Sequence, residues 1–155
     1  MIFQRVNRTD AECVFAIFQN VAGATFSLGA AGVWDTATQD GVRVKTPATA
    51  TLSCLVGVAA QTIADSAFGL FQVYGYRASA VVVNHTSTAI AAGDILIPVD
   101  AVRYLARSAA ADGKTGFIYA GEAVATGSAT TLNAKVFIRC MAALLTFGLM
   151  AAGLL

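Results

Sequence analysis

The stretch GLFQVYGYRASAVVV, from Gly69 to Val83, constrains the fold more than any other part of the sequence. It is rich in Val, Tyr and Phe, residues that favour strands, and it contains no proline. Strand periodicity places Tyr74 and Tyr76 on one face and Val73 on the other. Gly75, inside the run, predicts a bulge or a close backbone approach. We therefore expect a sheet that includes one long strand.

Shorter apolar runs, separated by clusters of Gly, Asp, Asn and Ser, recur along the chain, as is typical of an all-β sandwich or barrel. A capping-box pattern at Thr9–Glu12 favours a short helix there, but the Val, Ile and Phe content of the following residues favours a strand. In the last run, Val136 and Ile138 alternate with Lys135 and Arg139, which suits a sheet with one wet face. Further strands are predicted at 12–19, 25–28, 31–35, 42–45, 51–59, 94–98, 102–108, 117–124 and 131–140.

The predicted fold class is mainly β, a small single-domain β-barrel or sandwich. We expect an extended N-terminal arm at residues 1–10, a β-rich domain at 11–140 and an apolar C-terminal segment at 141–155, which could be helical. Neither an internal repeat nor a linker divides the chain further.

Composition indicates a protein that makes contacts over much of its surface. Hydrophobic residues make up 57% of the chain and charged residues only 12%, about half the usual share for a soluble domain. Large apolar patches on soluble proteins mark contact sites, so we expect copies of the chain or a partner to cover this surface. The ten Lys and Arg residues are dispersed, which argues against nucleic-acid binding.

Residues that could perform catalysis are scarce. His85, the single histidine, lies in a polar turn, and no nucleophile elbow or nucleotide-binding motif occurs. Glu122 is the one carboxylate inside an apolar run, and a partner at a strand edge or subunit interface explains it better than acid–base work. Cys13, Cys54 and Cys140 form no CxxC pair, so we expect buried free thiols in a reducing cytoplasm. We expect no enzyme activity, no cofactor and no metal site, and the charged N-terminus does not indicate export.

Several segments, taken in order, resemble a family of phage proteins. NVAGATFSLGAAGVWD (20–35) is similar to the opening of small capsid proteins of tailed bacteriophages, known as decoration, cement or head-stabilising proteins. The likeness continues through TATLSCLVGVAAQTIADSAFGLFQVYGYRASAVV (49–82), AAGDILIPVD (91–100) and FIYAGEAVATGSATTLNAKVFI (117–138). The apolar tail after Cys140 is not part of the family pattern.

This resemblance implies a β-rich structural protein of the virion that binds and stabilises an assembled capsid without substrate or cofactor. Its implied partners are the major capsid protein and copies of itself, as a trimer or another homo-oligomer on the capsid lattice. From the residues themselves we expect no nucleic-acid partner, and a membrane is the less favoured alternative. The protein would be made in the host cytoplasm and reside on the capsid surface. The candidate capsid or self-interface residues are Phe3, Arg5, Arg8, Trp34, Leu144, Leu145, Phe147, Leu149, Met150, Leu154 and Leu155.

The tail MAALLTFGLMAAGLL (141–155) leaves an alternative open, a small β protein anchored in a membrane. As a helix the tail would span roughly 22 Å, short of the ~30 Å hydrocarbon core of a bilayer. Arg139 prevents extension upstream, and no basic cluster or aromatic belt flanks the tail. We therefore favour a plug or arm packed among neighbouring copies or against the capsid.

Overall fold

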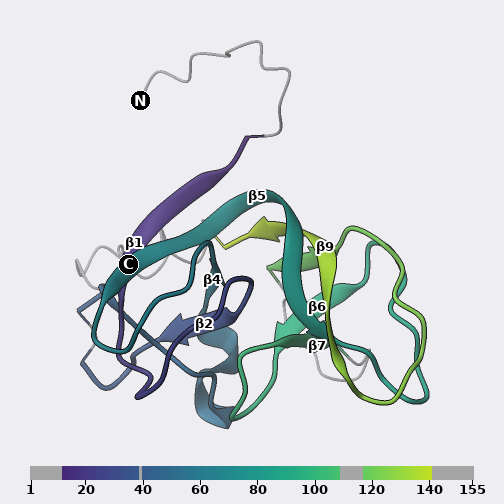
Figure 1. Cartoon of the computed structure of the whole chain (residues 1–155), viewed down its shortest axis with the longest axis horizontal. Helices are drawn as coiled ribbons and strands as arrows, with labels where there is room; N and C mark the ends of the chain where they lie inside the picture. Colours follow the sequence, from purple (N-terminus) through teal and green to yellow (C-terminus); the bar gives the residue numbers. More distant parts are fainter. Residues whose placement is uncertain (1–11, 39, 109–116, 141–155) are drawn as a thin grey trace, which may run out of the picture.

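The computed structural model describes residues 12–38, 40–108 and 117–140, and it is mainly β, with 48% strand and 5% helix. The predicted arm at 1–10 and the predicted apolar segment at 141–155 lie outside the described residues. One 3-10 helix, η1, lies between β3 and β4 (Figure 1). The elements are β1 (Val14–Asn20), β2 (Ala31–Trp34), β3 (Arg43–Lys45), η1 (Thr49–Cys54), β4 (Leu55–Ala59), β5 (Phe68–Val83), β6 (Ile95–Pro98), β7 (Leu105–Arg107), β8 (Ile118–Ala120) and β9 (Thr131–Arg139).

The first five strands form a closed barrel in the order β1-β3-β2-β4-β5, and the pairing of β1 with β5 closes it. β1 and β3 run parallel, while the other pairings of the barrel are antiparallel. The fold-class prediction is therefore confirmed in its barrel form.

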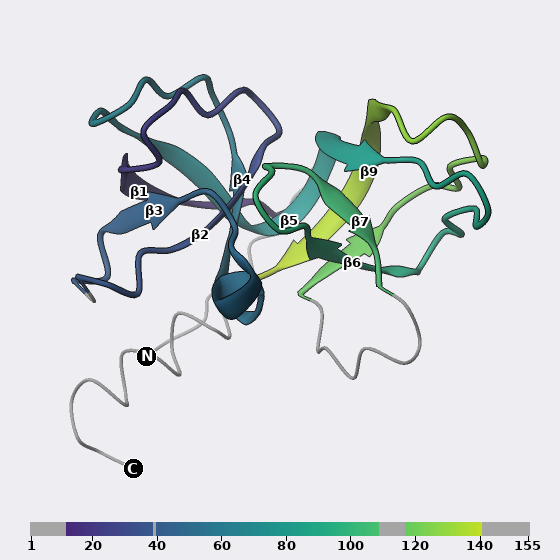
Figure 2. The same ribbon diagram turned by 90° about the horizontal axis from the view of Figure 1, so that it is seen from below.

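The remaining strands continue from the far half of β5 in a second ring of pairings, β5-β7-β6-β8-β9, which returns to β5. Figure 2 shows the two groups of strands side by side, with β5 passing from one to the other. The contact between β5 and β7 is a single pairing, Val82 with Leu105, whereas β9 follows β5 from Val83 to Tyr74. The predicted long strand is thus the element that both rings share.

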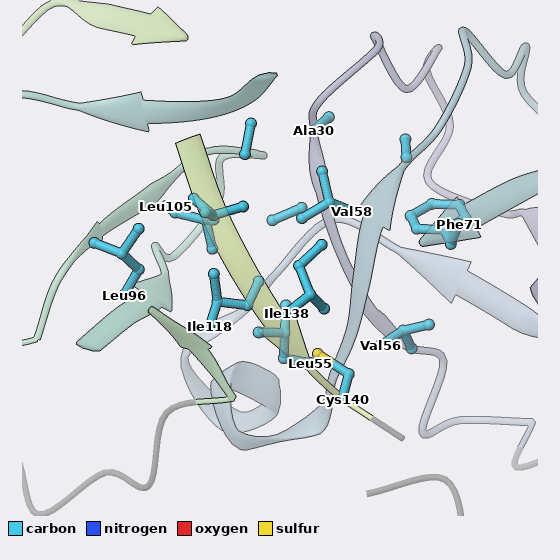
Figure 3. Packing of buried hydrophobic residues seen from close by; sticks show 14 of the residues in the cluster. Ala30, Leu55, Val56, Val58, Phe71, Leu96, Leu105, Ile118, Ile138 and Cys140 are labelled. Carbon is cyan, nitrogen blue, oxygen red and sulfur yellow. The ribbon is translucent and has the colours of Figure 1, made fainter. Parts of the chain in front are cut away.

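A single hydrophobic cluster fills both rings. Phe71 projects into the first ring, and Leu96 and Leu105 project into the second, while Val58, which pairs with Gln72, points to the opposite side of β4 from Phe71. Ile138 lies between these groups, with Ile118 on one side and Leu55 on the other (Figure 3), and it is fully buried. The cores of the two rings are therefore continuous.

Gly75 has the close backbone approach that its position in the strand predicts. Its φ is +101°, and a Cβ placed there would overlap the carbonyl oxygen of Glu12. Glycine is required because the chain entering β1 crosses β5 at this point.

Four strand predictions were too long, and one of them, 117–124, is strand only at 118–120. Residues 49–54 form η1, because the Thr51 hydroxyl both accepts from the Ala48 N–H and donates to the Ala48 carbonyl, and this turn outweighs β propensity. At 25–28 only Phe26 makes a β-bridge, with Ile63, before a turn at Gly29. Within 102–108 only 105–107 are strand.

Candidate interaction surface

The outward side of β1 and the first half of β5 carries four exposed apolar side chains, called here the β1–β5 apolar face. They are Phe15, Ile17, Phe68 and Leu70, with exposed fractions of 48%, 65%, 59% and 37%. Register brings them together, since Ile17 pairs directly with Leu70, and the next pairs on the same face, two residues away in each direction, are Phe15 with Gln72 and Gln19 with Phe68. A contiguous exposed apolar patch on a soluble domain marks a contact site.

This face exists because both sets of alternating side chains in β1 are apolar. Phe18 points into the barrel, where its ring meets the Phe71 ring edge-on at 5.8 Å between centroids. Phe15 and Ile17 therefore point outward and remain uncovered by the described residues. A strand that is apolar on both faces is typical of elements buried on both sides.

An aromatic cluster continues the outward side where β5 pairs with β9. Tyr76 pairs with Phe137, and the rings of Tyr74 and Phe137 meet edge-on with centroids 5.6 Å apart. Tyr76 and Phe137 are each more than a third exposed. The outward side of β5 thus offers apolar surface on both rings.

A polar network centred on Arg77 and Gln72 connects β5 to the end of β4. Arg77 donates from Nη2 to the Ala59 carbonyl (2.9 Å), from Nε to the Ser79 carbonyl (2.7 Å) and from Nη1 to Gln72 Oε1 (3.3 Å). Gln72 is buried and donates in turn to the carbonyls of Tyr74 and Tyr76. Burial lowers the pKa of Arg77 from its usual value. One of these acceptors, the Ser79 carbonyl, lies where the ladder between β5 and β9 is irregular, between Arg77 and Ala80, so the Arg77 bond replaces a missing ladder bond there.

A cleft of about 520 Å³ opens between the two rings and is lined by hydroxyl groups, small residues and Arg103. Arg103 donates from Nε to Thr46 Oγ1 (2.8 Å) and from Nη1 to the Thr25 carbonyl (2.7 Å), and its guanidinium lies 5.0 Å from the centre of the Phe26 ring. These contacts tie the connection between β6 and β7 to the first barrel. The role of Arg103 in this cleft is therefore structural.

Asn20, in the segment that resembles the phage family, organises a turn. Its side-chain nitrogen donates to the carbonyls of Ala24, Ile63 and Ala64, and its oxygen accepts from the Ala22 N–H. The side chain is fully buried, so these four bonds fix the crossing of two loops.

Two aspartates in the segments that resemble the phage family stabilise turns. Asp35 accepts from Lys45 Nζ at 2.8 Å, and this bond is the main cause that lowers the pKa of the Asp35 carboxyl. Asp94 accepts from the Ala91 N–H and pairs with Arg107, which together lower the pKa of the Asp94 carboxyl, the backbone bond contributing most.

The two residues that the sequence offered for catalysis lie at the surface. Glu122 accepts from the backbone N–H of Lys135 and pairs with its ammonium at 3.1 Å, and the backbone bond is the main cause that lowers the pKa of Glu122. The partner of Glu122 is therefore Lys135 on β9, a strand that pairs with β5 on one edge and β8 on the other, and not a residue at a strand edge or subunit interface as expected. His85 is exposed in the loop after β5. Across the described ranges, no group of three His, Cys, Asp or Glu side chains could hold a metal ion.

Cys54 and Cys140 are free thiols, and Cys13 Sγ donates to the Tyr76 carbonyl at 3.4 Å. Cys140 is buried, and this burial raises the pKa of its thiol to about 12. Cys13 and Cys54 are only partly buried, so the prediction of buried thiols is confirmed for one of the three.

Among the predicted interface residues, Trp34 is the one that the structure describes. It is partly buried at the end of β2, and its ring meets Phe18 edge-on at 5.0 Å between centroids. Its indole Nε1 is buried without a hydrogen-bond acceptor among the described residues. A role for Trp34 in an interface stays a prediction. The other predicted interface residues, Phe3, Arg5, Arg8, Leu144, Leu145, Phe147, Leu149, Met150, Leu154 and Leu155, lie outside the described residues.

Sequence reasoning missed the β1–β5 apolar face. Its signal is present in ECVFAIFQ (12–19), where the residues on both sides of the predicted strand are apolar. Reading that pattern as two buried faces would have placed a contact surface on β1.

In the part of the chain that the structure describes, none of the helices has the length and apolar character needed to cross a bilayer. No protein-family model matches the sequence, and no curated protein matches it with a significant score.

Proposed function

We propose that this chain is a structural virion protein, a decoration or cement subunit that binds an assembled bacteriophage capsid and stabilises it through subunit contacts. The observation that carries the proposal is the β1–β5 apolar face, a ready contact surface on a small β-barrel. Its partners would be the major capsid protein and copies of itself on the capsid surface. The proposal includes no reaction and no cofactor.

The ordered resemblance to phage capsid proteins supports this reading. The residues that carry the likeness include Asn20, Asp35 and Asp94, and each of them fixes a turn by hydrogen bonds to backbone N–H groups or carbonyls. Residues that fix the conformation of loops are useful in a protein that binds its partners through its surface.

The size of the face suits a role on a lattice. Its four side chains expose on the order of 400 Å² in total, compared with ~800 Å² that each partner buries in a standard interface. One such contact is weak by itself. Many copies placed side by side on a capsid, each touching more than one neighbour, raise retention far above that of a single contact.

The test uses capsid particles and two matched variants. Ile17→Lys places a charge in the middle of the face, whereas Leu28→Lys places the same charge on a side chain of similar exposure in the turn before β2. We expect gradient-purified particles to carry the wild-type chain and the Leu28→Lys variant in equal copy number, and to lose the Ile17→Lys variant. Recovery of the wild-type chain only from the cell lysate, or equal retention of both variants, would contradict the proposal.

The alternative, a small membrane-anchored β protein held by residues 141–155, has a separate readout. Carbonate washing of membranes from expressing cells would leave an anchored chain in the pellet, and a chain ending at Cys140 would then become soluble. Release of the full chain by the wash would remove this alternative.

A further inference from the structure

We propose that residues 141–155 of the free chain fold back onto its own β1–β5 apolar face and cover Phe15, Ile17, Phe68 and Leu70. This inference concerns the isolated protein; in the proposed function, residues 141–155 would leave the face when the chain binds a capsid, and the face would then form the contact.

The first step concerns the position of Cys140, where the described chain ends. Arg139 pairs with Tyr74 on one edge of β5, and Tyr74 pairs with Val14 of β1 on the other edge. The Cys140 N–H donates to the Val73 carbonyl at 2.9 Å. The chain therefore leaves β9 one strand away from β1.

The second step is the direction of the chain. β9 runs antiparallel to β5, so at Cys140 it points toward Phe68, the start of β5 and one end of the apolar face. β4 occupies the same edge of β5 at Phe71 and Gln72. The chain after Cys140 cannot extend the ladder and has to pass to one side of the sheet.

The third step is reach. From Val73 to Phe68 is five residues of strand, about 17 Å at the usual rise. Fifteen residues span roughly 22 Å even at the compact rise of a helix and roughly 50 Å when extended. The segment 141–155 is therefore long enough to cover the whole face.

The fourth step is chemical match and size. The segment contains no Asp, Glu, Lys or Arg, and it carries large apolar side chains such as Leu144, Phe147 and Leu149. The face, on the order of 400 Å², is about half of what one partner gives to a standard interface, so in the isolated protein a single short segment can cover it, whereas a second copy would be held only weakly. A segment tethered beside its site also acts at a high effective concentration, which favours the chain's own tail over that of a neighbour.

The experiment is carbene footprinting of the purified full chain, read by mass spectrometry. Leu28 is the internal reference, because it is exposed to a similar degree and lies outside the face. We expect the four face residues to label several-fold less than Leu28 in the full chain, at concentrations where sedimentation shows a monomer. Labelling equal to that of Leu28 in the full chain would overturn the proposal without any variant.

Two variants then test the occupant. In a chain that ends at Cys140, and in a full-length chain with Leu144, Leu145, Phe147 and Leu149 each changed to Ser, labelling of the face should rise several-fold while labelling of Leu28 stays constant. The serine variant keeps the chain length in case truncation disturbs folding. Protection that persists in both variants, or that appears only at concentrations where the full chain dimerises, would assign the face to another occupant. Loss of capsid binding alone would contradict the proposed function and leave this result unchanged.

Discussion

Shortening Ile138 should weaken both rings at once. Ile138 is fully buried, and its strand pairs with β5 on one edge and with β8 on the other. Ile138→Ala removes three carbon atoms from this position. Their transfer is worth about 2.4 kcal/mol, and the cavity that they leave raises the loss of unfolding free energy to about 4 kcal/mol.

Urea denaturation measures this loss with one probe for each ring. Trp34, the single tryptophan, reports the first barrel by fluorescence, and hydrogen exchange at Leu96 and Ile118 reports the second ring. With a slope of about 2 kcal/mol per molar urea, the midpoint should fall by about 2 M in both signals. Ile138→Val, the matched control, removes one carbon and should cost about 1 kcal/mol.

The two signals must move together for the reasoning to hold. If Ile138→Ala lowers exchange protection in β6 and β8 but leaves the Trp34 transition in place, the rings unfold independently. The continuous core would then be a contact between two independent units, and not the core of one cooperative unit, as its continuity leads us to expect.

Three further predictions follow from groups described above. Arg77→Met should lower the unfolding free energy by about 2–3 kcal/mol in the urea assay, because it leaves partly buried carbonyls without a hydrogen-bond donor. The control, Arg43→Met, removes an exposed ion pair and should lower the unfolding free energy by under about 1 kcal/mol. Folding lowers the pKa values of Asp35 and Asp94 below the ordinary 3.8. The stability that these two carboxylates contribute is therefore complete above about pH 4 and is lost as the pH falls through their folded pKa values. Acid titration followed by circular dichroism measures this loss. Cys140, with its pKa near 12, should stay unmodified by iodoacetamide at pH 8 after the other two cysteines have reacted, and early alkylation of Cys140 would contradict its burial.

Much of the strand content could be predicted because it depends on local alternation. β9 shows this best, since Val136 and Ile138 are buried while Lys135 and Arg139 are exposed, as the period of two requires. Closure of the barrel could not be predicted, because it depends on which strands pair. The decisive pairing, β1 with β5, joins residues about fifty positions apart.

The candidate surface was harder to predict than the fold, for a physical reason. Phe15 and Phe18 have the same residue type in the same strand, and only the direction of each Cβ relative to the barrel separates an exposed ring from a core ring. Trp34 stood out in the sequence by its size, yet its ring packs partly against the core. Residue type indicates that a side chain needs contact, while the pairing of strands decides whether the chain itself supplies that contact.

The shared strand β5 sets an order of events during synthesis. All five strands of the first barrel lie within residues 14–83, so this ring can close while the rest of the chain is still being translated. The far half of β5 must wait for β9, which begins 48 residues later at Thr131, a delay of roughly 3–10 s at usual ribosome speeds. Throughout that interval Ala80–Val83 offer an unpaired edge to any neighbouring nascent chain. Rapid translation of residues 84–139 should therefore favour soluble product, and slow codons in that stretch should favour aggregation.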